Sequence, residues 1–268
     1  MYGGEKIDRQ IANLKRTTHI VVATPGRLID LVNRKAVDIS KVKTVILDEA
    51  DEMLSMGFKK ELDEILGFLP EAQSKWLFSA TMPQGIKQIV NEHMSATAHR
   101  ITVSGSNVVN AKIEHKFVHC EDTEKFHVLL QFLNSVKGQR GIVFCRTRNT
   151  TKKVATQLIA KNVAAAAIHG DLLQKERDKV MRAFKNENLS IIVATDIAAR
   201  GIDVADLTFV VHFQLPDQDE YYTHRSGRTA RAGKEGISLV LANGYDVRTI
   251  REYEKNLKIS FTKIKALK

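Results

Sequence analysis

The chain has 268 residues, 43% of them hydrophobic, and a formal net charge of +10 at pH 7. No segment approaches the roughly 18–20 unbroken apolar residues of a membrane span, and the first ten residues lack the apolar stretch of a secretion signal. The two cysteines, Cys120 and Cys145, fit no paired metal or redox spacing. We therefore expect a cytoplasmic protein with no membrane partner, long enough for two modest domains.

The positive charge is concentrated in the second part of the chain. Residues 1–103 carry 14 Lys and Arg against 13 Asp and Glu, whereas residues 104–268 carry 27 against 18. A basic excess of this kind favours a polyanionic partner, although a solvated basic surface would give the same counts. Charge alone leaves the two interpretations equal.

Residues 1–103 read as strand–turn–helix units. Strands are expected where apolar and β-branched residues cluster, at 19–24, 42–48 and 75–81, and helices at 27–34, after residue 51 to Leu69, and at 83–94. Trp76 and Phe78 flank Leu77 in the third strand, so we expect both rings in the core rather than stacked on bases. Residues 101–111 are rich in Ser, Gly and Asn, which indicates a linker.

Residues 112–268 repeat this pattern with more strands. They are expected at 112–120, 141–145, 163–168, 190–195, 208–213 and 236–241. Asp171 and Gln174 form a D-x-x-Q capping box that predicts a helix at 172–185. Continuously apolar strands that alternate with helices indicate a parallel sheet covered on both faces. The predicted fold class is α/β, with a first domain at 1–103, a linker at 104–111 and a second domain at 112–268.

Polar turns follow six of the expected strands. They are ATPGR (23–27), DEAD (48–51), SAT (79–81), CRTR (145–148), HGD (169–171) and ATDIAARGID (194–203). Ligands of open α/β sheets bind beyond the carboxyl ends of the strands, so six such turns form a pattern. Asp48 and Glu49 directly follow an apolar strand. Phosphate-transferring ATPases place two carboxylates in this way, one that binds Mg²⁺ and one that orients the attacking water.

A phosphate-binding loop is missing from this sequence. Such carboxylates normally follow a G-x-x-x-x-G-K-[ST] loop. The glycines that precede Asp48 are Gly3, Gly4 and Gly26, and none of them leads into Lys-Ser or Lys-Thr. The chain therefore carries half of a catalytic site without the loop that would hold the phosphates.

The segment HRSGRTARAG, residues 224–233, places Arg225, Arg228 and Arg231 three residues apart. On a helix these side chains would lie close to one face, where like charges repel one another. A bound anion would relieve that repulsion, and arginine suits bidentate contact with phosphate. A solvated basic face is the alternative, and it is disfavoured once DEAD stands in the same chain.

Taken together, these motifs resemble the DEAD-box RNA helicases. DEAD at 48–51, SAT at 79–81, ARGID at 199–203 and HRSGRTAR at 224–231 occur in the order and approximate spacing of that family, over essentially the whole chain. Related helicases often carry His where this chain has Asp51, so that residue indicates the DEAD-box branch. The resemblance implies two RecA-like parallel-sheet domains joined by a short linker, with ATP and Mg²⁺ bound between them and RNA across both.

The resemblance also implies roles in ATP hydrolysis. Asp48 would hold Mg²⁺ through water, and Glu49 would orient or deprotonate the attacking water. The residues that would couple hydrolysis to domain closure are Asp51, Ser79, Thr81 and His224. Arg228 and Arg231 would be arginine fingers on the γ-phosphate, a contact that can contribute ~10³–10⁵ in rate. Gly201 and Asp203 would contact the nucleotide, with the carboxylate at its ribose.

A different set would contact RNA. Thr24 and Pro25 predict a helix N-cap and a first-turn proline, so Gly26 and Arg27 would present free N–H groups to a phosphate. The other implied RNA-binding residues are Gly3, Gly4, Arg146, Gly170, Gln174, Arg177, Thr195 and Asp196. Contact with phosphate and sugar implies little sequence preference and binding that weakens as salt rises.

This sequence departs from the family pattern at its start. The family's phosphate-binding loop, its adenine-reading glutamine motif and its first RNA-contacting motif would all lie upstream of residue 1. We therefore expect an N-terminally truncated chain, unable to hydrolyse ATP alone, whose incomplete first domain exposes strand edges and apolar surface.

The favoured hypothesis is a core fragment of an ATP-dependent RNA helicase, whose parent separates short RNA duplexes and remodels RNA–protein complexes. The alternative is a non-enzymatic RNA-binding or annealing module, and Asp51 disfavours a DNA translocase. A metal site of His115, His119 and Cys120 is also disfavoured, because on a strand the two histidines would be ~13 Å apart.

Overall fold

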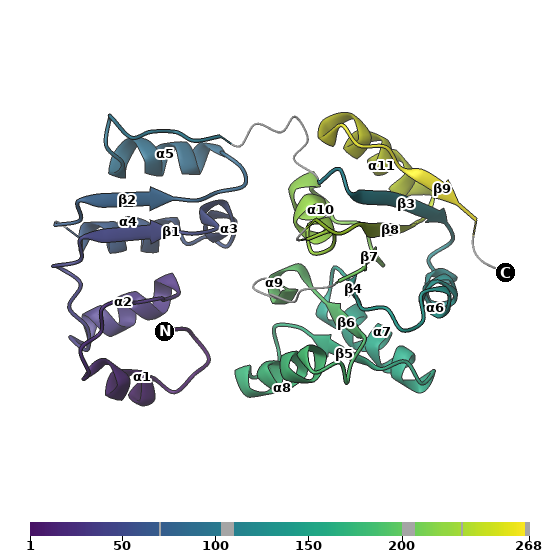
Figure 1. Cartoon of the computed structure of the whole chain (residues 1–268), viewed down its shortest axis with the longest axis horizontal. Coiled ribbons are helices and arrows are strands. Elements are labelled where there is room, and N and C mark those ends of the chain that lie inside the picture. The colour runs from purple at the N-terminus through teal and green to yellow at the C-terminus, as the bar shows by residue number, and fades with distance from the viewer. Residues whose placement is uncertain (70, 103–109, 200–206, 232, 266–268) are drawn as a thin grey trace. The chain divides into compact units, whose positions relative to one another are not determined.

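The structure is a computed structural model that describes residues 1–69, 71–102, 110–199, 207–231 and 233–265 (Figure 1). The chain divides into two compact units, Met1–Val103 and Ser104–Lys268. Most of the linker expected at 104–111 lies outside the described residues. Within the described ranges, every helix is too short or too polar to cross a membrane.

The first unit is built on a two-stranded parallel sheet, β1 (Thr44–Leu47) and β2 (Ser74–Leu77). Its helices are α1 (Ile7–Leu14), α2 (Pro25–Asn33), α3 (Ala50–Ser55), α4 (Lys59–Gly67) and α5 (Gln84–His93). One face of the sheet packs on the helices, where Leu47 meets Leu62 of α4 and Ile86 of α5. Gly57, with φ +87°, separates α3 from α4, so the single helix expected up to Leu69 is two.

The other face of this sheet carries exposed apolar side chains. Trp76 and Phe78 are 52% and 51% exposed, so their expected place in the core was wrong. Their rings stack with centroids 6.3 Å apart. Side chains alternate along a strand, so Leu47 points to the helices while Ile46, paired in register with Trp76, points away. The uncovered apolar surface expected in the first unit is therefore present in the structure.

Residues 19–24, expected to be a strand, do not form one, and Ile20 and Val22 are largely exposed. The N–H of Thr24 donates to the carbonyl of Met1 at 2.9 Å. A strand needs a continuous series of backbone hydrogen bonds to a neighbouring strand, and pairing with the first residue of the chain alone does not provide one.

The second unit contains seven strands and six helices in its described residues. In chain order they are β3 (Ile113–His119), α6 (Lys125–Ser135), β4 (Gly141–Phe144), α7 (Arg148–Ala160), β5 (Ala165–Ile168), α8 (Gln174–Lys185), β6 (Ile191–Ala194), α9 (Asp196–Ala199), β7 (Phe209–His212), α10 (Asp219–Ser226), β8 (Gly236–Ala242), α11 (Gly244–Leu257) and β9 (Thr262–Ile264). The sheet order is β5-β6-β4-β7-β8-β3-β9, and every pair is parallel. All six strands expected here are present.

Helices cover both faces of this sheet. On one face Val143 and Val193 pack against α6 and α7, and on the other Ile142 and Ile192 pack against α8 and α9. The second face continues over β8 and β3, where α10 and α11 lie. The continuous apolar strands are explained by this double burial.

The helix α8 begins at Gln174, and its cap differs from the predicted one. Leu173 is the N-cap residue, and its N–H donates to the carboxylate of Glu176 at 2.9 Å. The predicted capping box of Asp171 and Gln174 was therefore wrong. Asp171 lies before the cap, and its carboxylate binds Lys152 instead.

Candidate functional site

The DEAD turn begins where β1 ends. Asp48 and Glu49 are both exposed, and the N–H of Glu49 donates to Asp48 Oδ1 at 3.0 Å. Glu49 is the N-cap residue of α3 and has a left-handed backbone, with φ +50°. Non-glycine residues adopt this conformation at a cost, and such residues cluster at functional sites. The turn therefore presents two exposed carboxylates at the carboxyl end of a strand.

Asp51 connects this turn to the SAT turn that follows β2. It is 8% exposed, and its Oδ2 accepts hydrogen bonds from the N–H and the hydroxyl of Thr81, both at 2.8 Å. Ser79 closes the second turn by donating to the carbonyl of Thr81 at 2.6 Å. The backbone repeats the connection, because Ala50 N–H donates to Phe78 O at 3.0 Å. The structure thus brings together three of the four residues predicted to form one polar network.

The protonation of Asp51 is set by these contacts. Burial raises the pKa of its carboxyl group, but hydrogen bonds led by that of Thr81 outweigh burial, and the net pKa is lowered. Asp51 is therefore ionised at neutral pH.

The predicted RNA-contacting residues of the first unit lie on two neighbouring turns. Thr24 is the N-cap residue of α2 and Pro25 opens the helix, as predicted. Arg27 donates to the carbonyl of Glu5 at 3.2 Å, which fastens the start of α2 to the turn that contains Gly3 and Gly4. Gly4 has φ +82°, a conformation that glycine adopts without strain.

In the second unit, the predicted turns follow adjacent strands. β5, β6 and β4 are neighbours, and Gly170, Thr195 and Arg146 follow them at the same edge of the sheet. Arg146 is directed along this edge, where it donates to Leu215 O at 2.6 Å and pairs with Asp217 at 2.8 Å. Its contact with RNA remains a prediction, and it would require that pair to open.

The three arginines of HRSGRTARAG do not share a helix face, so that prediction was wrong. The helix α10 ends at Ser226, which leaves Arg228 and Arg231 beyond it, and Arg225 is only 2% exposed. Arg225 makes a bidentate pair with Asp196, at 2.5 and 2.7 Å, and donates to Gln214 O at 2.8 Å. Its charge is neutralised within the fold, because Asp196 supplies the anion that we expected from a ligand.

Below Arg225 lies a buried polar network that sequence reasoning missed. Tyr222 Oη lies 2.5 Å from His115 Nδ1 and 3.1 Å from Ser238 Oγ, and Ser238 also contacts His212 and Ser226. Burial lowers the pKa of His115 to about 4 and that of His212 well below its usual value. The signal was a histidine inside the apolar run TFVVHF. His115 thus belongs to the core of the second unit.

The remaining predicted site residues of the second unit lie on α8, on α10 or outside the described residues. Gln174 donates to Asp178 at 2.8 Å on α8, and burial lowers the pKa of the neighbouring Arg177. His224 lies on α10 and is partly buried. Gly201 and Asp203 lie outside the described residues, so their predicted nucleotide contacts stay predictions.

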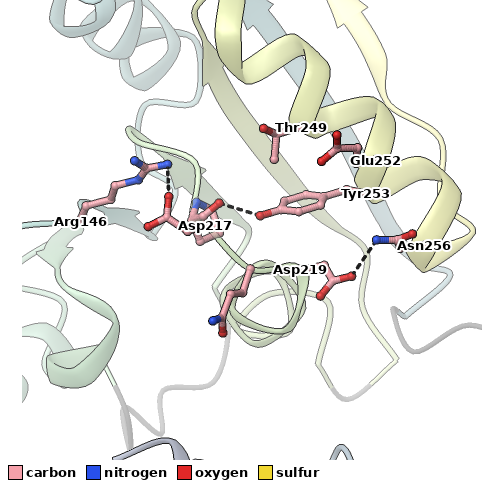
Figure 2. Close-up of a pocket in the computed structure, with 9 residues that line it drawn as sticks. Arg146, Asp217, Asp219, Thr249, Glu252, Tyr253 and Asn256 are labelled. Atoms are coloured by element: carbon pink, nitrogen blue, oxygen red, sulfur yellow. Dashed lines mark hydrogen bonds and ion pairs between the residues drawn. The ribbon is translucent and has the colours of Figure 1, made fainter.

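Figure 2 shows a pocket of about 350 Å³ between the turn at 216–219 and α11. Tyr253 donates to Pro216 O at 2.6 Å across it, and Asn256 donates to Asp219 at 3.2 Å. Its charged lining consists of Asp217, Asp219, Glu252 and Arg146. Three carboxylates against one guanidinium disfavour a phosphate-bearing ligand, so this pocket is not the nucleotide site.

One group in the described residues has the composition of a metal site. Asp63, Glu92 and His93 place their ligand atoms within 4.8 Å of one another. Lys59 lies 3.0 Å from Asp63 and 3.9 Å from Glu92, and His93 Nε2 is 2.9 Å from Asp63. The ammonium already supplies the positive charge that these carboxylates need.

Comparison with known proteins decides the family. Residues 1–89 match the DEAD/DEAH box helicase family, and residues 124–233 match the helicase conserved C-terminal domain. The chain is 41% identical over 258 residues to the DEAD-box ATP-dependent RNA helicase CshA of Bacillus cereus, which covers 96% of this chain and 49% of that protein. The chain belongs to the DEAD-box RNA helicase family. It spans about half the length of the curated relatives that it matches.

Solved structures of DEAD-box proteins show the same fold. S. cerevisiae Dbp5 L327V bound to RNA and ADP BeF3 matches with a TM-score of 0.86 and 27% identity, over 94% of this chain and 66% of that one. A DEAD box protein from Methanococcus jannaschii matches with a TM-score of 0.56 and 41% identity, over 98% and 71%. The α/β units of this DEAD-box chain are therefore RecA-like, as predicted.

Proposed function

We propose that this chain supplies the DEAD, SAT and arginine motifs of an RNA-dependent ATPase that separates short RNA duplexes and remodels RNA–protein complexes. The observation that carries the proposal is the double hydrogen bond from Thr81 to Asp51, which joins the DEAD turn to the SAT turn. A displacement of the carboxylates at the end of β1 is thereby transmitted to the end of β2. The relatives support the proposal, because they are named as ATP-dependent RNA helicases.

Mg²⁺ fits the residues present, whereas the phosphates of ATP would also need the G-x-x-x-x-G-K-[ST] loop that this sequence lacks. Mg²⁺ prefers oxygen ligands, and Asp48 is an exposed carboxylate at a strand end. Bound MgATP supplies the phosphoryl group that is transferred to water. Glu49 would orient that water and accept its proton, while Asp51, Ser79 and Thr81 would hold the DEAD and SAT turns. From the second unit, Arg228 and Arg231 would stabilise the negative charge of the phosphates, and His224 would join the polar network. The contacts of Gly201 and Asp203 with the nucleotide remain predictions.

RNA is the proposed polyanionic partner. Its backbone would lie along Gly3, Gly4 and the start of α2 on the first unit, and on the second unit along the residues that end β4, β5 and β6 and open α8. Dbp5, the structural relative, is bound to RNA and ADP BeF3 in the solved structure. We assign residues 1–103 and 112–268 to the two helicase domains, 104–111 to their linker, and the protein to the cytoplasm.

The 268 residues should not hydrolyse ATP by themselves, because they contain no G-x-x-x-x-G-K-[ST] loop. The test compares RNA-stimulated phosphate release by this chain with that of a longer polypeptide in which such a loop precedes Met1. Turnover should be present only in the longer polypeptide and should be lost with Glu49→Gln. Robust turnover by the 268-residue chain, sensitive to Glu49→Gln, would contradict the proposal for the chain alone.

A non-enzymatic RNA-binding or annealing module is the second candidate. The complete seven-stranded sheet of the second unit and the excess of 27 Lys and Arg over 18 Asp and Glu in residues 104–268 favour it. Both candidates bind RNA, so turnover by the longer polypeptide separates them. Absence of turnover together with salt-sensitive RNA binding would favour the module.

A further inference from the structure

An unexpected cluster of charges lies where α7 begins and β5 ends. Arg148 and Lys152 lie one turn apart on α7, and both bind the carboxylate of Asp171 in the turn after β5. Lys152 Nζ is 2.8 Å from Asp171 Oδ2, and Arg148 donates to the other oxygen, Oδ1. Like charges four residues apart on a helix repel each other. The two cations are therefore held together by a single internal anion.

The backbone around this cluster also suits an anion. Thr147 is the N-cap residue of α7, a helix of 13 residues, and the amino end of a helix attracts negative charge. Gly170 is exposed and lies directly before Asp171, so the backbone of this turn is open to solvent beside Arg148. A group with several anionic oxygens could reach both cations here.

His169 supplies an independent observation. Its ring is buried, and its Nδ1 has no hydrogen-bond partner. Asp171 Oδ2 lies 4.0 Å from this nitrogen, which is beyond hydrogen-bond distance. A buried polar atom without a partner costs free energy, so the arrangement favours an alternative in which Asp171 moves towards His169. That movement would draw Asp171 away from Arg148 and Lys152, and another anion would then neutralise the two cations.

We propose that Arg148 and Lys152 bind one phosphodiester group of RNA, and that Asp171 occupies this place when RNA is absent. The arriving phosphate takes both cations, and the released Asp171 carboxylate accepts a hydrogen bond from His169 Nδ1. The two cations keep an anionic partner throughout the exchange, while Asp171 loses two ion pairs and gains one hydrogen bond. Asp171 therefore competes with RNA and weakens its binding. This inference rests on the RNA binding proposed above and adds three residues to it.

RNA is favoured over a small anion because both cations are exposed. Exposed cations beside a sheet edge suit a continuous backbone, whose other phosphates bind elsewhere, better than one isolated ion that solvent competes for. Inorganic phosphate shares the chemistry, and it therefore serves as the second probe in the experiment.

The test measures binding of fluorescent single-stranded oligouridylate to the full 268-residue chain. Asp171→Asn should tighten binding about three- to tenfold at about 50 mM salt, and the gain should shrink at about 200 mM. Glu187→Gln is the matched control, since it removes the same charge from an exposed carboxylate near Arg140, beside the opposite end of β6. We expect its affinity to change less than twofold.

A reciprocal pair of variants tests the cations. Lys152→Gln should weaken RNA binding about three- to tenfold, whereas Lys153→Gln, its exposed neighbour on α7, should change affinity less than twofold. In ¹⁵N spectra of the histidine rings, the Nδ1 signal of His169 should move on addition of oligouridylate. Inorganic phosphate at equal phosphate concentration should move it far less.

The outcomes separate the inference from the proposed function. If the wild-type chain binds no RNA, the proposed function fails and this inference fails with it. If the wild type binds RNA but Asp171→Asn behaves like Glu187→Gln, only the inference is overturned. Equal movement of the His169 signal with inorganic phosphate would show a small-anion site and overturn the assignment to RNA.

Discussion

The two units of this chain place polar turns at strand ends on very different sheets. In the second unit, helices cover both faces of a seven-stranded parallel sheet, and its inner strands β4, β6 and β7 are buried along their whole length. In the first, two strands pack on helices with one face and expose Ile46 and Trp76 on the other. Yet the hydrogen bonds that join the DEAD and SAT turns, at 2.8 Å, are about as short as the one at 2.7 Å between Arg225 and Asp196 in the second unit.

The difference teaches that the geometry of these turns depends on local hydrogen bonds more than on a complete sheet. Asp51 and Thr81 hold each other directly, and Ala50 bonds Phe78 beside them. In the second unit, Arg225 instead depends on burial beneath the turns after β6 and β7, because it binds both Asp196 and Gln214 O. The first unit should therefore be sensitive at its turns, and the second at its core.

The largest expected effect comes from Gly141→Ala at the start of β4. A Cβ at this position would lie 2.1 Å from Cε2 of Phe209, whose ring packs edge-on against Phe132. The overlap should destabilise the second unit by about 3 kcal/mol. Denaturant unfolding followed by circular dichroism measures this loss, and Gly244→Ala, which meets nothing within 4 Å, is the control.

Trp76 is the only tryptophan and lies in the first unit, so its fluorescence reports on that unit separately. If the units are independent, Gly141→Ala should shift the circular dichroism transition and leave the fluorescence transition in place. A fluorescence transition that moved by the same amount would show that the two units unfold together.

The next largest effect is expected from Asp51→Ala in the first unit. The change leaves the N–H and the hydroxyl of Thr81 without their acceptor, which should cost about 2 kcal/mol of unfolding free energy. Asp48→Ala removes an exposed carboxylate three residues earlier and should cost less than about 0.5 kcal/mol. Fluorescence of Trp76 during urea unfolding measures both.

The loss caused by Asp51→Ala should depend on pH in a defined direction. The pKa of Asp51 is lowered in the folded state, so its ionised form stabilises the fold above its unfolded pKa of about 4. This contribution disappears as pH falls through the folded pKa. The difference between wild type and Asp51→Ala should therefore shrink below about pH 4, and a constant difference would contradict the role of the charge.

A smaller effect on stability, with a larger effect on association, is expected from Trp76→Thr. The ring is half exposed on the uncovered face, so its removal should cost only about 1 kcal/mol. Exposed apolar patches promote association, and the variant should self-associate less in sedimentation velocity. Ile159→Thr changes a similarly exposed residue on α7 of the second unit, and it should leave association unchanged.

Six of the seven strands of the second unit could be predicted from sequence, because burial on both faces gives its inner strands continuous apolar runs. The edge strand β9 has three residues, none of them buried, and was not predicted. The same reasoning failed for residues 19–24 and for Trp76, since an apolar run shows what a residue would bury but not whether a partner is present to cover it. Which strands have neighbours depends on the whole sheet, and two strands are too few to bury both faces.

The residues of the candidate site likewise fall into those whose grouping could be predicted from sequence and those whose grouping could not. Asp51, Ser79 and Thr81 were predicted together because their motifs fix positions at two adjacent strand ends, and the structure joins them. Arg225 was predicted to share a helix face with two other arginines, because the three are spaced three residues apart. That prediction was wrong, since spacing cannot show that the helix ends at Ser226. Pairs between distant segments, such as Arg225 with Asp196, depend on tertiary contacts that the sequence pattern does not contain.

The smallest effects are expected at two residues with a left-handed backbone conformation, one in each unit. Lys35 follows α2 with φ +55° and is exposed, whereas Ala230 has the same φ and is buried. Lys35→Gly should stabilise the first unit by about 0.5–1 kcal/mol, because glycine adopts this conformation without strain and nothing buried is lost. Ala230→Gly relieves similar strain but removes a buried methyl group worth about 0.8 kcal/mol, so its net effect on the second unit should be near zero. Urea unfolding measures both changes, and equal stabilisation by the two would show that packing around Ala230 contributes nothing.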